Sequence, residues 1–261
     1  MSFLTLDKVS HYYFSQTQFT KALEDISFSI EAGEFISIIG PSGCGKSTIL
    51  SVIAGIMKQT EGNIYVENKS IHDVDINIGY MLQQDYLFPW KSILDNILIG
   101  PKIKDSLSTE MREKASTLLA DVKLDGLEQH YPSELSGGMR QRVALIRTLI
   151  TDPDILLFDE PFSALDYVTK LNLENTVAQI VKNLHKTTIL VTHDLGEAIS
   201  MSDRILLMDT NPGRIANTFT VPTSIRNEKP FYVRRHEDYQ PLFDYIWKHL
   251  NDEADVERNE V

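Results

Sequence analysis

Four short runs of apolar residues predict strands that are buried on both faces. They are Phe35–Ile39, Ile155–Phe158, Thr188–Val191 and Ile205–Met208. A strand with one solvated face alternates between apolar and polar residues, whereas these runs need helices on both sides, as in a parallel sheet. Helical patterns lie between the runs. The alternation of strands and helices therefore predicts an α/β fold built on a parallel sheet.

One of these helices is marked by a clear period. Its apolar positions recur at i, i+4, i+7 and i+11, namely Met139, Val143, Ile146 and Ile150. This spacing places them on one helix face. The other face is left to Arg140, Gln141 and Arg147.

The stretch from Asp85 to Tyr131 contains no convincing strand and is predicted to be a helical insertion. Ser108 is a plausible helix cap, with Glu110 as a first-turn acid. The apolar stripe of the helix that follows is Met111, Ala115, Leu118, Leu119 and Val122.

The amino-terminal stretch predicts a smaller antiparallel unit. Leu4–Val9 and Ile26–Ile30 have the pattern of two antiparallel strands. The connection between them is predicted to be a polar and aromatic loop that contains His11, Tyr12, Tyr13 and Phe14.

Composition narrows the classes of protein. The 261 residues carry 25 Lys and Arg against 37 Asp and Glu, a net charge of −12, which argues against a general nucleic-acid binder. The single cysteine, Cys44, permits no internal disulfide and fits a reducing compartment. No apolar stretch approaches the roughly 18 to 20 residues that span a bilayer. We expect no secretory signal at the amino terminus and, from Asn251 onward, an acidic disordered tail.

A phosphate-binding loop follows the first buried run. Residues 40–48 read GPSGCGKST and match G-x-x-x-x-G-K-[ST]: Gly40, Pro41, Ser42, Gly43, Cys44, Gly45, Lys46, Ser47 and Thr48. The glycines allow backbone N–H groups to turn toward phosphates, the lysine adds charge for the β and γ phosphates, and the serine hydroxyl faces Mg²⁺. The lysine and the helix start should also lower the pKa of the Cys44 thiol.

Two acids follow the second buried run. Ligands of parallel α/β sheets bind beyond the carboxyl ends of the strands, so Asp159 and Glu160 should emerge at the phosphate site. Alone, the pair reads as a solvated loop. Beside a phosphate-binding loop, Asp159 is predicted to hold Mg²⁺ through water, and Glu160 to orient and deprotonate the attacking water.

A second small-residue helix start lies in LSGGMRQ, residues 135–141, where Ser136, Gly137 and Gly138 form another potential anion site. One nucleotide does not need two such sites from one chain. Together the motifs resemble the nucleotide-binding subunit of ATP-binding cassette (ABC) transporters, whose signature is LSGGQ. In that family two copies pair head to tail, and the signature of one copy closes over the γ-phosphate held by the other.

The resemblance covers about residues 4–214 and implies further roles. Tyr13 matches the aromatic that stacks on adenine, with Tyr12 and Phe14 as close competitors. Gln83 matches the glutamine that reaches Mg²⁺ and the water, with Gln84 as the alternative. His193 matches the switch histidine at the γ-phosphate, although a histidine at a strand end is more often structural. Ser163–Asp166 matches the loop across the dimer interface, and Met139 stands where many members have glutamine.

The resemblance also implies a domain plan. Residues 1–84 and 133–222 would form the ATPase core, a P-loop NTPase (RecA-like) sheet with an antiparallel β subdomain. Residues 85–132 would form a helical insertion that continues into the signature helix to about residue 150. Residues 223–261 would be a C-terminal extension with one helix.

The chain also resembles one importer branch of the family, that of nitrate, sulfonate and taurine importers, which also includes bicarbonate transporters. The resemblance lies in the Pro89–Trp90 pair, in Asn211–Ile215 and in the terminal helical stretch Tyr239–Leu250. They imply an ATPase that uses ATP and Mg²⁺ at the cytoplasmic face of a bacterial membrane. Its partners would be a second copy, permease subunits on Tyr86–Trp90 and, indirectly, an extracellular solute-binding protein. A soluble single-cassette ATPase in an assembly or regulatory complex is the alternative.

Overall fold

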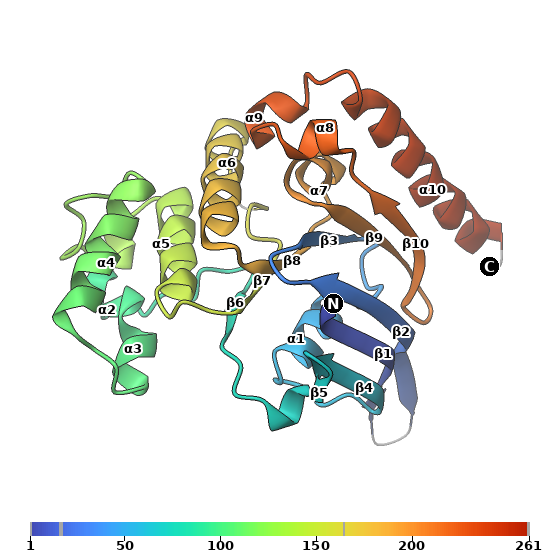
Figure 1. Ribbon diagram of the computed structural model, residues 1–261, viewed down its shortest axis with the longest axis horizontal. Helices are drawn as coiled ribbons and strands as arrows, with labels where there is room; N and C mark the ends of the chain where they lie inside the picture. Colours follow the sequence, from blue (N-terminus) through green and yellow to red (C-terminus); the bar gives the residue numbers. More distant parts are fainter. Residues whose placement is uncertain (1, 16–17, 164, 260–261) are drawn as a thin grey trace.

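The computed structural model describes residues 2–15, 18–163 and 165–259, with the side chains described as far as Asn251 (Figure 1). Its main sheet has six strands in the order β10-β9-β3-β8-β7-β6. The strands are β3 (Phe35–Ile39), β6 (Ile78–Met81), β7 (Ile155–Asp159), β8 (Thr187–Val191), β9 (Arg204–Asp209) and β10 (Arg214–Thr220). The four predicted strands and the parallel sheet are confirmed, while β6 and the antiparallel edge strand β10 were not foreseen.

A second sheet is antiparallel, in the order β2-β1-β4-β5. Its strands are β1 (Ser2–Phe14), β2 (Phe19–Glu31), β4 (Glu61–Val66) and β5 (Lys69–Ser70). The predicted loop at His11–Phe14 is wrong, because these residues extend β1 and pair with residues 19–23 of β2. Aromatic residues favour strands and interact across them, as Tyr12 and Phe19 do with ring centroids 6.0 Å apart.

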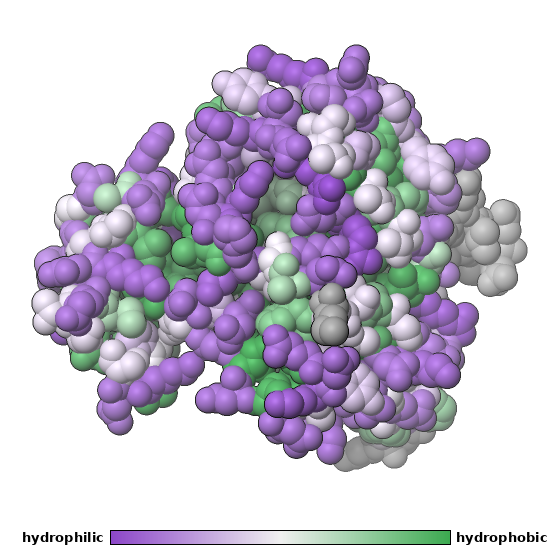
Figure 2. Space-filling model, in the orientation of Figure 1, coloured by the Kyte–Doolittle hydropathy of each residue, from purple (hydrophilic) through white to green (hydrophobic). Residues whose placement is uncertain are grey.

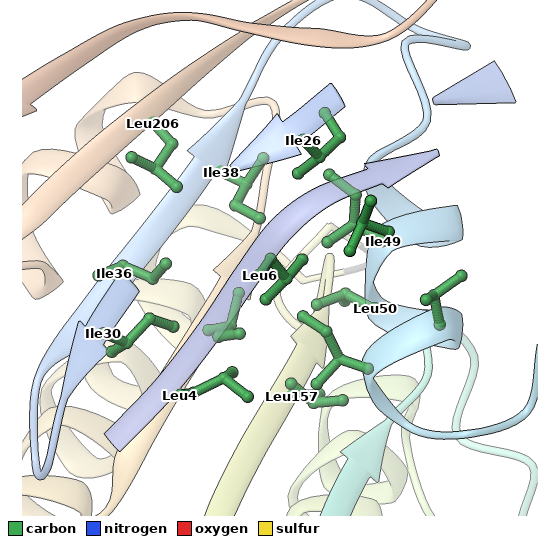
Figure 3. Packing of buried hydrophobic residues seen from close by; sticks show 14 of the residues in the cluster. Leu4, Leu6, Ile26, Ile30, Ile36, Ile38, Ile49, Leu50, Leu157 and Leu206 are labelled. Carbon is green, nitrogen blue, oxygen red and sulfur yellow. The ribbon is translucent and has the colours of Figure 1, made fainter. Parts of the chain in front are cut away.

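The first helix, α1 (Lys46–Ile53), packs between the two sheets. Figure 3 shows Ile49 and Leu50 of α1 facing Leu6 of β1, with Ile38 of β3 and Leu157 of β7 in the same cluster. All five side chains are at most 2% exposed. This packing fixes the start of α1 relative to the ends of β3 and β7.

Helices cover the other face of the main sheet. They are α5 (Gly137–Leu149), α6 (Tyr167–Leu184) and α7 (Leu195–Met201). A second apolar cluster joins Phe158 of β7 and Leu190 of β8 to Leu173 and Val177 of α6 and Leu145 of α5. The parallel strands are therefore covered on both faces, as their mainly apolar sequences require.

The region predicted to lack strands is helical, as expected. It contains α2 (Ile93–Ile97), α3 (Ile99–Ile103) and α4 (Thr109–Asp121), besides the short 3-10 helices η1 (Ile71–Asp73) before it and η2 (Pro132–Glu134) after it. Ser108 caps α4 and accepts a hydrogen bond from Met111 N. A separate apolar cluster joins this region to one face of α5. The domain boundaries given above stay predictions.

The C-terminal segment, residues 223–259, holds α8 (Thr223–Arg226), α9 (Pro230–Val233) and α10 (Tyr239–Asn259). In Figure 1 α10 runs along the outer side of the sheet, and Ile246 packs in a cluster with Phe219 of β10. The tail expected to be disordered from Asn251 instead continues α10 to Asn259. Adding residues to an existing helix costs far less than starting one, which explains the difference.

Hydrophilic residues dominate the face of the molecule in Figure 2, in line with the high net charge. Within the part of the chain described, no helix combines the length and the apolar character needed to cross a membrane.

Candidate functional site

The glycine-rich loop leaves β3 and turns directly into α1, as predicted. Lys46 Nζ lies inside the loop and donates hydrogen bonds to the carbonyl oxygens of Gly40 at 2.8 Å and Pro41 at 2.7 Å. A Cβ on Gly45 would lie 2.5 Å from Leu23 Cδ2, and Gly45 has a φ of 95°. A Cβ on Gly43 would meet open space. Packing beneath the loop thus requires glycine at position 45, whereas Gly43 faces the open side.

Asp159 ends β7 beside the start of α1. Its Oδ1 accepts a hydrogen bond from Ser47 Oγ at 3.0 Å, and its Oδ2 accepts one from Tyr80 Oη at 3.4 Å. Burial raises the pKa of the Asp159 carboxyl and raises the pKa of Tyr80 to about 12. A carboxylate beside a hydroxyl oxygen is the hard-oxygen set that Mg²⁺ takes. Tyr80 had no signal in the sequence, because β6 itself was not recognised.

Glu160 lies at the centre of three predicted residues. Its Oε2 accepts a hydrogen bond from Gln83 Nε2 at 3.2 Å and lies 3.2 Å from His193 Nδ1. The backbone of Glu160 is left-handed, with a φ of 47°, and its N–H donates to Val191 O at 2.9 Å. Strained backbone of this kind gathers at functional sites. This turn leaves Glu160 lining the open side of the site.

These residues line one cleft of about 530 Å³, formed by Gly40, Ser42, Gly43, Gly45, Lys46, Ser47, Thr48, Gln83, Glu160 and His193. Its size is in the range of small-molecule sites. Gln84 is not among the lining residues, so of the two glutamines Gln83 faces the cleft. The N–H groups at the start of α1 and the Lys46 ammonium make this cleft suited to a polyphosphate.

Tyr13 lies next to the cleft. Its Oη is 3.2 Å from Thr48 Oγ1, and 43% of the residue is exposed. The strand alternates, so Tyr12 packs with Phe14 and Phe19 instead. The structure thus brings Tyr13 to the phosphate-binding loop rather than its two competitors, and its contact with adenine stays a prediction.

The expectation that the Cys44 thiol has a lowered pKa is wrong. Its side chain is 1% exposed, and burial raises the pKa of the thiol. The Lys46 ammonium, 3.6 Å from the sulfur, acts in the opposite direction but does not outweigh the loss of water. The sequence shows that a lysine is near, but not that Cys44 points into the core beneath the loop.

The predicted signature residues and Asp166 belong to helix starts outside the cleft. Ser136 caps α5, where Oγ accepts a hydrogen bond from Met139 N at 3.3 Å, and Gly137 and Gly138 form the first turn. Asp166 caps α6 and accepts from Thr169 N at 3.1 Å. None of the four lines the cleft. Ala164 lies outside the described residues, so the predicted interface loop 163–166 is described only in part.

The polar face of α5 holds the segment between β6 and α2. Gln141 is 4% exposed and donates to Pro161 O at 2.9 Å. Arg147 donates to Asp85 O at 2.6 Å and to Tyr86 O at 2.9 Å. Arg140 Nε pairs with the Asp85 carboxylate at 2.9 Å. The helix that begins with the signature residues is therefore hydrogen-bonded to two segments next to Glu160. One is the segment after Gln83, and the other is the loop after β7.

Sequence reasoning missed Asn96, which shapes the loop after that segment. The side chain of Asn96 is 0% exposed. Its Oδ1 accepts from Phe88 N at 2.7 Å, and its Nδ2 donates to the carbonyls of Phe88, Lys91 and Ser92 at 3.2, 3.1 and 2.9 Å. The loop held in this way displays Trp90, which is 71% exposed.

Comparisons with known proteins agree with this geometry. The family described as "ABC transporter" matches residues 23–163. The chain is 52% identical to "Uncharacterized ABC transporter ATP-binding protein YtlC" of Bacillus subtilis (strain 168), over 99% of this chain and 100% of the relative. It is 40% identical to "Aliphatic sulfonates import ATP-binding protein SsuB" of Bacillus cereus (strain ATCC 10987 / NRS 248), over 89% of this chain and 93% of that one.

Among solved structures, the fold is similar to the dimeric ATP-binding cassette MJ0796 in a post-hydrolysis state, bound to ADP and Pi. The TM-score is 0.75 at 32% sequence identity, and the match covers 84% of this chain and 99% of that cassette.

Proposed function

The chain belongs to the ABC transporter ATP-binding family and is an ATPase that uses ATP and Mg²⁺, and from this premise we propose that it powers the uptake of a small solute through partner membrane subunits. In the proposed site the nucleotide phosphates lie along the loop at Lys46, and Tyr13 stacks on adenine. Ser47, Asp159 and Gln83 hold Mg²⁺, which neutralises phosphate charge when it is bound.

The reaction proposed for this site is attack of water on the γ-phosphate. Glu160 accepts a proton from that water, and its carboxylate is already oriented by hydrogen bonding to Gln83 and by its proximity to His193. His193 reaches the γ-phosphate from the end of β8. The bond between the γ-phosphorus and the β–γ bridging oxygen breaks as the new P–O bond to water forms, and the bridging oxygen leaves with ADP, so the products are ADP and phosphate.

The second anion site belongs, in this proposal, to a neighbouring copy. Ser136, Gly137 and Gly138 are clear of the cleft of their own chain, and Ser136 and Gly137 are exposed. Two copies arranged head to tail would bring the signature of each to the Lys46-held phosphate of the other. Asp166 would lie at the same interface. A cassette of similar fold is a dimer in its solved structure, which supports this arrangement.

The observation that supports the transport role is the aromatic loop, residues 86–90, which Asn96 holds in place. Trp90 is 71% exposed and Tyr86 is 58% exposed, while Leu87 between them is buried. Large aromatic side chains fixed on a rigid loop are the anchors that partner proteins bind. We assign this surface to a cytoplasmic helix of the membrane subunit, which would hold the chain at the cytoplasmic face of the membrane.

For the solute we propose an organic sulfonate or an anion of similar size, chosen by the membrane and binding proteins rather than by this chain. The support is the 40% identity to a relative named for aliphatic sulfonate import. The competing function, a soluble assembly or regulatory ATPase, needs no membrane attachment.

Membrane sedimentation distinguishes the two functions. In cells that express the whole gene set, the chain should sediment with membranes and be released by detergent. Trp90→Ala should move it to the soluble fraction without changing MgATP binding. Ile103→Ala is the matched control, because Ile103 is 77% exposed on α3 but lies outside the aromatic loop. A wild-type chain found only in the soluble fraction contradicts the transport role.

The solute is tested on the complex extracted in detergent together with its extracellular binding protein. An aliphatic sulfonate should raise the melting temperature of the binding protein, and nitrate should not. The reverse order would reject the proposed solute while leaving the transport role intact.

A further inference from the structure

A cluster of charged side chains next to His193, two of them fully buried, joins three parts of the chain. Its acids are Asp194 and Glu197 from the turn before and within α7, and Glu174 from α6. Its cations are Lys170 from α6 and Arg234, which follows α9 in the C-terminal segment. Glu174 is 0% exposed and Glu197 is 2% exposed, so both depend on partners inside the protein.

Lys170 holds the turn that carries His193. Its Nζ lies 2.6 Å from Asp194 Oδ2 and 2.5 Å from Glu197 Oε1. Asp194 in turn caps α7 by accepting from Glu197 N at 3.1 Å, and its own N–H donates to Thr192 Oγ1 at 3.0 Å. The turn is therefore fixed on both sides of residue 193.

The His193 ring has little packing of its own. Its side chain is 65% exposed, and Nδ1 lies 3.2 Å from Glu160 Oε2. Its position in the cleft therefore depends on the backbone of the turn rather than on neighbours of the ring.

Arg234 neutralises the remaining acid of the cluster. Its Nη1 and Nη2 donate to the two carboxylate oxygens of Glu174 at 3.0 and 3.3 Å, a bidentate pair. The side chain also lies against the first turn of α7, because a Cβ on Gly196 would lie 3.2 Å from Arg234 Nε, 3.1 Å from Tyr239 Oη and 3.0 Å from Asp194 Oδ1.

Charge balance shows what Arg234 does for this turn. Three carboxylates share two cations in the cluster. Lys170 and Glu174 are four residues apart on α6, and side chains at that spacing are neighbours. Without Arg234, the fully buried Glu174 competes with Asp194 and Glu197 for the single ammonium of Lys170.

We propose that Arg234 is a positioning residue for ATP hydrolysis: it neutralises Glu174 so that Lys170 stays on Asp194 and holds the turn that places His193 beside Glu160. Arg234 lies beyond the segment matched by the family, residues 23–163. The C-terminal segment thus contributes to hydrolysis without touching the nucleotide. The inference rests on the role proposed for His193.

The test uses the full chain and steady-state hydrolysis of MgATP. Arg234→Gln removes the charge and keeps a hydrogen-bond donor, and Arg234→Met removes both. We expect kcat to fall about tenfold, as a small misplacement of a catalytic group does, with KM for MgATP within about twofold of wild type. Arg235→Met is the matched control, since Arg235 is the exposed neighbour and should leave both constants unchanged.

A second substitution tests the charge balance itself. In Glu174→Met combined with Arg234→Met, no carboxylate at position 174 competes for the Lys170 ammonium, so Lys170 stays paired with Asp194. We therefore expect kcat to recover to within about threefold of wild type. Replacing a buried ion pair by apolar residues of similar volume is compatible with folding. Arg234→Lys, which keeps a cation near Glu174, should also remain close to wild type.

The outcomes separate the possible failures. Variants that melt like wild type, with the kcat of Arg234→Gln equal to that of Arg235→Met, overturn the inference. A double variant that melts like wild type but hydrolyses as slowly as Arg234→Met overturns it as well. If Arg234→Met does not fold, Arg234→Gln and the double variant decide. Full turnover in His193→Ala would instead contradict the role proposed for His193 in the site.

Discussion

Replacing Asn96 by alanine should destabilise the protein and loosen the loop that displays Trp90. The substitution removes four hydrogen bonds to the backbone of residues 88–92. Two of the backbone groups keep another partner, because Phe88 O also accepts from Lys91 N and Ser92 O also accepts from Asn96 N. The Phe88 N–H and the Lys91 carbonyl have no second partner recorded among the described residues.

The expected size follows from those two groups. A buried polar group left without a partner costs about 1 to 3 kcal/mol, and both of these lie in a half-buried loop, so we expect a loss of about 2 to 3 kcal/mol in the free energy of unfolding. Urea unfolding followed by circular dichroism measures it. Asn172→Ala is the matched control, because Asn172 is exposed on α6 and should change the free energy by less than about 0.5 kcal/mol.

The same variant should also weaken attachment to the membrane subunits while MgATP binding is retained. The reasoning is refuted if Asn96→Ala unfolds at the same urea concentration as Asn172→Ala. It is refuted in part if the loss of stability occurs but membrane attachment is unchanged, since the loop would then not need Asn96 to present Trp90.

Four further predictions concern the site and its surroundings. Glu160→Gln should lower turnover by roughly 10² or more while ATP binding survives. Size-exclusion chromatography of this variant should show a dimer when ATP is present. A monomer with ATP at micromolar protein concentration would contradict the shared site. Adding Ser136→Arg to that chain should abolish the dimer by filling the second anion site. Cys44 should react with iodoacetamide only as fast as the loop opens, so mass spectrometry after a short exposure should find native protein unmodified and urea-unfolded protein modified. Burial alone would raise the pKa of Asp194, but the hydrogen bond and charge of Lys170 outweigh burial and lower it. Wild type should therefore be more stable than Asp194→Asn by a constant amount from pH 7 to pH 5, and this difference should shrink as the pH falls below the ordinary carboxyl pKa. Urea melts that show the same difference across the whole range would contradict this.

The strands that could be predicted are those whose sequence reflects burial on both faces. β3 is apolar except for Ser37, and β7 is apolar up to Asp159, so both were recognised. β6 was not recognised because Gly79 interrupts its apolar pattern. A Cβ at Gly79 would lie 2.9 Å from both Pro153 Cγ and Thr148 Cγ2, so close packing by the end of α5 and the chain after it requires the residue that makes the strand look weak.

In the candidate site, local motifs placed Lys46, Asp159 and Glu160 because each follows a strand that could itself be recognised. Their partners across the chain could not be found in that way. Asn96, for example, is an ordinary residue in a short helix, and only the folded backbone brings the groups of residues 88–92 to it. Arg234 and Glu174 are 60 residues apart, and no local pattern links them.

The bonds from Arg147 to the segment after Gln83 end on main-chain carbonyl oxygens, which every amino acid carries. Substitutions at Asp85 and Tyr86 therefore leave these attachment points in place. The side chains of this segment can change while its linkage to Arg147 of α5 is kept. Of the contacts described above between α5 and this segment, the pair between Arg140 and the Asp85 carboxylate is the one that depends on an exchangeable side chain.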